Sequence, residues 1–180
     1  MMDLNELKLI KLFGREPCPE AIRWMIDKAD LREMWNTCER GDWMWWALIH
    51  TKCPTQKQSI SFAKWCLESA EKEVSSFASA HSVEYMRNAY SAVAFCEHSA
   101  HPEQWALDAS NSATIAVAVD AARDGECDTI YGTLIYGLGY AEERKKQADW
   151  IRKHIPFPQK TVAKKLENTM PDPDCERNIE

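Results

Sequence analysis

Glycine is scarce in this sequence, and positive charge does not dominate it. Six glycines in 180 residues are too few for an architecture built on many tight β-turns. The net charge of −6 at pH 7 opposes the electrostatic attraction that supplies most non-specific nucleic-acid binding, so we expect no direct nucleic-acid partner. No apolar run approaches the roughly 20 residues that a membrane-spanning helix needs, so we expect no membrane role.

A secretory signature is also missing. No charged and apolar signal segment opens the chain, and the seven cysteines are odd in number and lie among long helical patterns rather than in a short secreted framework. We therefore expect reduced thiols and a cytoplasmic location.

Apolar residues recur with helical rather than alternating spacing along almost the whole chain. A length of 180 residues with 45% hydrophobic and 28% charged residues favours one folded domain. We predict an all-α, single-domain bundle of about seven or eight helices. The domain covers residues 1–158, and residues 159–180 form an extension with a short helix and a mobile tail. The expected helices are roughly 3–13, 19–27, 31–38, 43–50, 55–80, 83–97, 102–124 and 129–153.

Several helix starts carry capping signals. Thr55 with Gln58 is a capping-box pattern, and Asp30 with Glu33 resembles one. In the tripeptide "RGD", we expect Gly41 to end one helix in the left-handed conformation and the aspartate after it to cap the next.

The densest group of potential metal ligands is "CEHSAH", with Cys96, His98 and His101. A thiolate and two imidazoles suit zinc, which would need a fourth ligand or a water. The spacing is not that of a known zinc signature, and helix-end histidines beside a buried cysteine explain it more simply. We expect no metal and no cofactor.

Other candidate chemistry is weak. The acids of "EERKK", residues 142–146, fit a solvated helix face on which Glu142 pairs with Lys146 one turn later. The sequence has no strand-turn-helix context and no glycine-rich loop that would indicate a nucleophile with its base and orienting group. We therefore expect a protein that is not an enzyme.

Three of the eight tryptophans fall within four positions, in "DWMWW". Adjacent residues on a helix point about 100° apart, so Trp45 cannot share a face with Trp43 and Trp46. We predict that Trp43 and Trp46 are buried, and that Trp45 points outward as a contact for a partner.

The order of these motifs resembles a known group. Residues 6–48 contain the pattern W-x-x-C-x-R-G-D-W-x-x-W, which is similar to the fifth immunity-protein family of polymorphic toxin systems, helical proteins of bacteria and phages. The closing segment "ERKKQADWIRKHIP", residues 143–156, is also similar to the last helix of that group. The matching residues of the pattern are Trp35, Cys38, Arg40, Gly41, Asp42, Trp43 and Trp46.

The resemblance implies a binding protein that neutralises a toxin or defence effector by direct contact, in the host cytoplasm if a phage encodes it. An acidic surface suits a basic partner. The alternative is a small-molecule or nucleotide-binding sponge with a pocket near Arg40 and Asp42, and a distant third is a metal-dependent hydrolase at Cys96.

We interpret the W-x-x-C-x-R-G-D-W-x-x-W signature mainly as structural: its tryptophans hold two helices together around a tight turn. Arg40 and Asp42 then pair with each other, with backbone ends, or with Asp149 or Arg152 of the last helix. The alanine-rich helices before it suit packing within one chain or between two copies, so homo-oligomerisation stays open.

Overall fold

The computed structural model describes residues 13, 17–28, 30–51, 54–74, 78–122 and 130–157, with side chains from residue 137 onward in the last range. Two expectations fall outside these residues: the helix at 3–13, apart from Phe13, and the extension at 159–180.

Seven helices and no strands make up the described part of the chain, which confirms the all-α prediction. They are α2 (Pro19–Ile26), α3 (Leu31–Thr37), α4 (Gly41–His50), α5 (Gln56–Glu73), α6 (Ala80–His98), α7 (Pro102–Ala121) and α8 (Ile130–His154).

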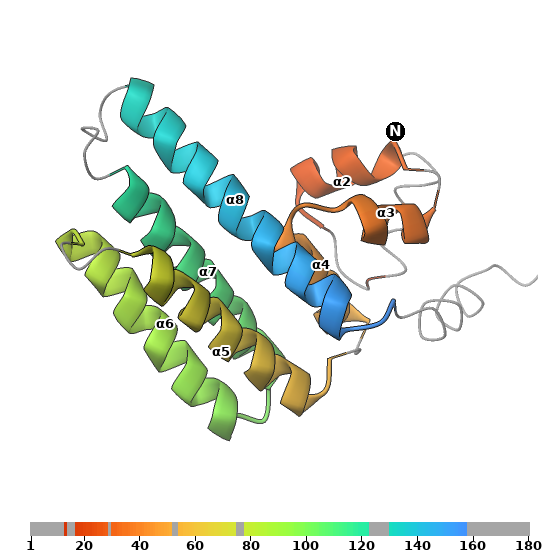
Figure 1. The fold of residues 1–180 in the computed structure, drawn as a ribbon. Coiled ribbons are helices and arrows are strands. Elements are labelled where there is room, and N and C mark those ends of the chain that lie inside the picture. Colours follow the sequence, from red (N-terminus) through yellow and green to blue (C-terminus); the bar gives the residue numbers. More distant parts are fainter. Residues whose placement is uncertain are drawn as a thin grey trace, which may run out of the picture.

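The helices form a bundle around α7, with a smaller unit at one side. Helix α7 packs against α5, α6 and α8, and α4 packs across α7 and α8. The short helices α2 and α3 lie together on the side of α8 away from α5 and α6 (Figure 1). The molecule therefore has a main core within the bundle and a second apolar cluster where α2 and α3 meet α4.

Local signals set several helix boundaries as predicted. Thr55 and Gln58 form a complete capping box at the start of α5, and the Asp30 side chain accepts a hydrogen bond of 2.8 Å from the Glu33 backbone N–H. Helix α5 ends at Glu73, well before the predicted residue 80, because Val74 is extended and closes the last turn with its N–H.

Small residues let α7 approach its neighbours closely. Alanines at 106, 109, 113, 116 and 118 are completely buried. Because alanine adds only one carbon beyond the backbone, helix axes can lie near the short end of the usual 8–10 Å range. The alanine-rich segment therefore packs within one chain.

Gly41 has a different role from the predicted one. Helix α3 ends at Thr37, Arg40 is the N-cap of α4, and Gly41 is the first residue of α4. A Cβ atom at Gly41 would lie 2.4 Å from Gln147 Cβ and 2.9 Å from the Ala148 backbone nitrogen. Glycine is needed here because α4 begins directly against the backbone of α8, and not because a helix ends in the left-handed conformation.

The described cysteines, Cys18, Cys38, Cys66 and Cys96, are free thiols. Among the described helices, none has the length and apolar character that crossing a membrane requires.

Candidate functional site: an aromatic pocket beside the Arg40–Asp42 pair

The segment between α3 and α4 is held by an arginine from α8. Arg152 Nη1 donates to the carbonyl oxygens of Cys38 at 2.7 Å and Trp35 at 3.1 Å, and Arg152 Nη2 pairs with Asp149 at 2.7 Å. The last carbonyls of a helix have no partner within the helix. Arg152 therefore ties the end of α3 to the closing helix, and Asp149, 60% exposed, orients it from outside.

Arg40 and Asp42 pair with each other, one of the three predicted arrangements. The Nε and Nη2 groups of Arg40 donate to the two carboxylate oxygens of Asp42 at 3.0 and 2.8 Å. Burial works to raise the pKa of Asp42, but these hydrogen bonds and the nearby Arg144 charge outweigh it, so the pKa is lowered. The guanidinium also lies over the Trp43 ring, 4.3 Å from its centroid.

Behind this pair lies a buried guanidinium, that of Arg144, which is 2% exposed. Its Nη1 donates to Ser110 Oγ and Gln147 Oε1, both at 3.0 Å, and its Nη2 donates to Asn111 Oδ1 at 2.7 Å. Its Nε lies 3.6 Å from Asp42 Oδ1, too far for a good hydrogen bond. Two guanidinium groups thus face one carboxylate.

Glu143 is the second unexpected buried charge of α8, with no exposed surface. Burial raises its pKa to about 7, opposed by Lys146 and the Ser69 hydroxyl. The Lys146 ammonium lies 3.7 Å from the carboxylate. The prediction that residues 142–146 form a solvated face is therefore wrong for Glu143 and Arg144, although Glu142 and Lys146 do pair, at 3.8 Å.

This burial predicts a pH dependence of stability. The folded-state pKa of Glu143 lies above the ordinary value of 4.5, so its contribution is complete below that pH and is lost as the pH rises through about 7. We expect Glu143→Gln to reduce the fall in the free energy of unfolding between about pH 5 and pH 8. Urea titrations of the wild type and of Glu143→Gln across this range measure the free energy of unfolding at each pH. If the two proteins lose stability equally between about pH 5 and pH 8, the prediction is contradicted.

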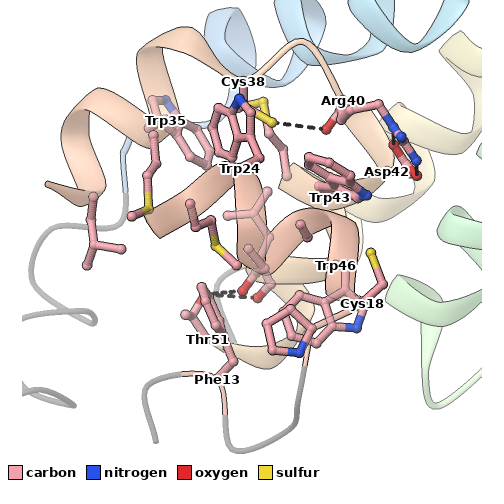
Figure 2. Close-up of a pocket in the computed structure, with 18 of the residues that line it drawn as sticks. Phe13, Cys18, Trp24, Trp35, Cys38, Arg40, Asp42, Trp43, Trp46 and Thr51 are labelled. Atoms are coloured by element: carbon pink, nitrogen blue, oxygen red, sulfur yellow. Dashed lines mark hydrogen bonds and ion pairs between the residues drawn. The ribbon is translucent and has the colours of Figure 1, made fainter. Parts of the chain in front are cut away.

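An apolar pocket of about 340 Å³ opens beside the Arg40–Asp42 pair. Three aromatic pairs line it, with ring centroids 5.2 to 5.9 Å apart and tilted or edge-on planes. Arg40 and Asp42 lie together at one side of the pocket, away from Phe13 and Thr51 (Figure 2). The three pairs are Phe13 with Trp46, Trp24 with Trp43, and Trp35 with Phe157.

The phase of α4 decides which tryptophans reach this pocket. Residues Gly41, Met44, Trp45 and Leu48 face the bundle and are buried. The positions between them, 43 and 46, turn toward α2 and are only partly buried. The prediction that Trp43 and Trp46 are buried therefore holds only in part: both pack against the apolar clusters, but they also form walls of the pocket.

Trp45 is the largest fully buried side chain described, with no exposed surface. Its ring stacks on Phe62 at 4.2 Å, and its indole N–H donates to the Glu103 carbonyl at 2.9 Å. The prediction that Trp45 is an outward partner contact is wrong, because the bundle covers the face of α4 on which it lies.

The weak metal candidates do not come together. The Cys96 thiol is buried and donates to the Pro102 carbonyl at 3.1 Å, while His98 is exposed and the His101 side chain is 80% exposed. Within the described ranges, no three His, Cys, Asp or Glu side chains are grouped as metal ligands.

Several site residues were missed from sequence, above all Asn111 and Arg144. One signal was available: positions 144, 148, 151 and 155 share a helix face by their spacing of three or four, and three of them are alanine or isoleucine. That face is buried, so the arginine on it had to be buried too.

Fold and site together define an all-α protein with an aromatic pocket edged by an arginine–aspartate pair. Comparison of the chain with protein families, with curated proteins and with solved structures gives no match. The likeness to helical immunity proteins therefore stays a prediction based on the sequence pattern.

Proposed function

We propose that this protein is a non-enzymatic binding protein that holds a small molecule in the aromatic pocket. The observation that carries the proposal is the pocket itself, about 340 Å³ and lined by six aromatic side chains. Small-molecule sites typically measure about 300–1,000 Å³ and combine apolar walls with a few placed polar groups. From sequence, this function was the alternative to effector inhibition.

The surrounding structure supports a preformed site. Arg152 holds the end of α3, Gly41 lets α4 lie against α8, and the Arg40–Asp42 pair fixes the turn between them. Each of these contacts ties the pocket walls to the bundle. A rigid pocket loses less conformational freedom on binding, which favours affinity.

Two measurements test this function. Heat-denatured protein purified from cells is expected to release a bound small molecule that mass spectrometry detects. Ala47 lines the pocket, so Ala47→Phe should fill it and reduce the amount released by about tenfold or more. Ala94→Phe, the same change at an exposed position of α6, is the control and should leave the amount unchanged. An extract with no ligand from either protein would contradict the proposal.

A second function, inhibition of a toxin or defence effector, is favoured by a different surface. Helix α6 exposes three large apolar side chains along its length, Val83, Tyr90 and Phe95, to 46%, 52% and 55%. Tyrosine and phenylalanine are enriched in the buried centres of protein interfaces. The net charge of −6 adds attraction toward a basic partner.

This second function has its own test. Cells that express a toxin encoded beside this gene should survive when the wild-type protein is present. Survival should fall with Val83→Lys, and Ala47→Phe should still protect. If cells that carry the wild-type protein die with every toxin encoded nearby, this role is excluded.

A further inference from the structure

We infer that the pocket selects a planar aromatic anion, with the anionic group at the Arg40 side and the ring system between the aromatic walls. This inference rests on the proposed small-molecule function and names the ligand class. Aromatic carboxylates and mononucleotides both belong to that class. The charges around the pocket are the main support for it.

A cationic ligand is disfavoured because cations already lie over three of the wall rings. Lys28 lies 5.2 Å from the Trp24 centroid, Arg32 lies 5.3 Å from that of Phe157, and Arg40 lies 4.3 Å from that of Trp43. Aromatic cages bind cations through the negative face of the ring. A further positive charge here would meet rings that are already engaged and three like charges.

The polar side of the pocket carries an excess of positive charge. Arg40 and Arg144 share the single carboxylate of Asp42. Glu20 also approaches Arg40, at 3.5 Å, but its side chain is 65% exposed, so solvent screens it. Glu143 lies against the Lys146 ammonium. Arg40 lines the pocket and Arg144 lies behind Asp42, so an incoming anion would pair with the Arg40 guanidinium and gain from the Arg144 charge behind it.

Asn111 supplies a donor at the same place. It lines the pocket, and its Oδ1 accepts the 2.7 Å hydrogen bond from Arg144 Nη2. Arginine has no acceptor, so this bond fixes the amide orientation and leaves the Asn111 NH₂ group as a donor. That NH₂ group donates to none of the described residues. A carboxylate or phosphate oxygen of a ligand whose acidic group lies at the Arg40 side could accept from it.

The walls favour a flat body over a bulky one. The wall rings meet at interplanar angles of 54° to 62°, so both ring faces and ring edges border the space. Flat rings gain from offset-stacked and edge-to-face contacts with such walls, beyond the area that they bury. The ligand therefore combines a planar ring with an acidic group.

Three probes with one ring system and different charges test the inference by isothermal titration calorimetry. Indole-3-acetate is the anion, indole-3-acetamide is neutral, and tryptamine is a cation. We expect indole-3-acetate to bind about tenfold or more tightly than the amide, and tryptamine to bind least. Adenosine monophosphate and adenosine form a second pair, in which the anionic group is a phosphate. Whichever anion binds more tightly, indole-3-acetate or adenosine monophosphate, shows whether the pocket prefers an aromatic carboxylate or a nucleotide.

A variant locates the anionic group. Asn111→Asp keeps an oxygen for Arg144 and replaces the NH₂ donor with a second carboxylate oxygen, so the fold should be retained while the anion is repelled. We expect it to weaken the preferred anion by about tenfold or more and to leave the neutral analogue within about twofold. Asn88→Asp, the same change on the exposed face of α6, is the control and should bind like the wild type.

The outcomes separate this inference from the proposed function. If neutral and anionic members of a pair bind equally, or tryptamine binds best, the pocket binds ligands but the anion selectivity is overturned. If Asn111→Asp and wild type bind the anion equally, the head-group assignment is overturned. If the cell-purified protein releases no molecule and none of the probes binds, the proposed function itself fails.

Discussion

Trp45→Ala is expected to lower the free energy of unfolding by about 3–5 kcal/mol, the range for removing a fully buried tryptophan from a core. Trp45 has no exposed surface, stacks on Phe62 and donates to the Glu103 carbonyl. The substitution leaves a cavity where α4, α5 and α7 meet and removes the indole donor from the Glu103 carbonyl, a partly buried contact. Urea denaturation followed by far-ultraviolet circular dichroism measures the loss.

Trp46→Ala is the matched control for this prediction. Trp46 lies one residue along the same helix but is partly exposed in the pocket wall, so its removal should cost distinctly less. The sequence-based expectation was the reverse, with Trp45 outside and Trp46 inside. A loss below about 1 kcal/mol for Trp45→Ala, the scale of an average substitution, would contradict the buried position.

The second large effect is expected at Gly41. A methyl group there would lie 2.4 Å from Gln147 Cβ, 2.9 Å from the Ala148 nitrogen and 3.0 Å from the Arg144 carbonyl oxygen. Two of these atoms belong to the backbone, so α4 and α8 must move apart. We expect Gly41→Ala to cost about 3 kcal/mol or more, the upper part of the range for overpacking, measured by urea denaturation.

Gly137→Ala is the control for this substitution. Gly137 lies within α8 and is exposed, and a Cβ atom added there would meet nothing within 4 Å among the described residues. Since glycine costs about 0.5–1 kcal/mol relative to alanine inside a helix, this variant should be more stable than the wild type. If Gly41→Ala were also neutral or stabilising, the close approach of α4 and α8 would be wrong.

The Gly41 contact also links stability to the pocket. Gly41 precedes Asp42 and Trp43, and the residues that it touches on α8 include Arg144 and Gln147. Any shift that relieves the clash moves the Asp42 carboxylate relative to Arg144. Ligand binding should therefore weaken in Gly41→Ala even at temperatures where the variant stays folded.

Much of the helical layout was predictable because it depends on local interactions. Capping at Asp30 and Thr55 satisfies backbone N–H groups within three residues, and proline at the starts of α2 and α7 suits the first turn. Most predicted boundaries fall within a few residues of the observed ones. The main exception is α5, which ends at Glu73 and not near residue 80.

The candidate site was predictable only in part. The signature residues Arg40, Asp42, Trp43 and Trp46 do meet at one place, and Arg152 of the closing helix reaches the same turn. Asn111 and Arg144 were not anticipated, because their roles come from the contact of α7 with α8. In sequence, Arg144 stands among charged neighbours that resemble an ordinary solvated face.

By itself, the sequence determined that this protein is helical, where most of its helices begin, and which string of residues is unusual. Those properties follow from side-chain spacing and from contacts within one turn. Tertiary structure alone decided that Trp45 is inside, that Trp43 and Trp46 line a pocket, and that Gly41 is a contact point between helices. The reason is that burial belongs to a helix face, and the neighbouring helices determine which face is covered.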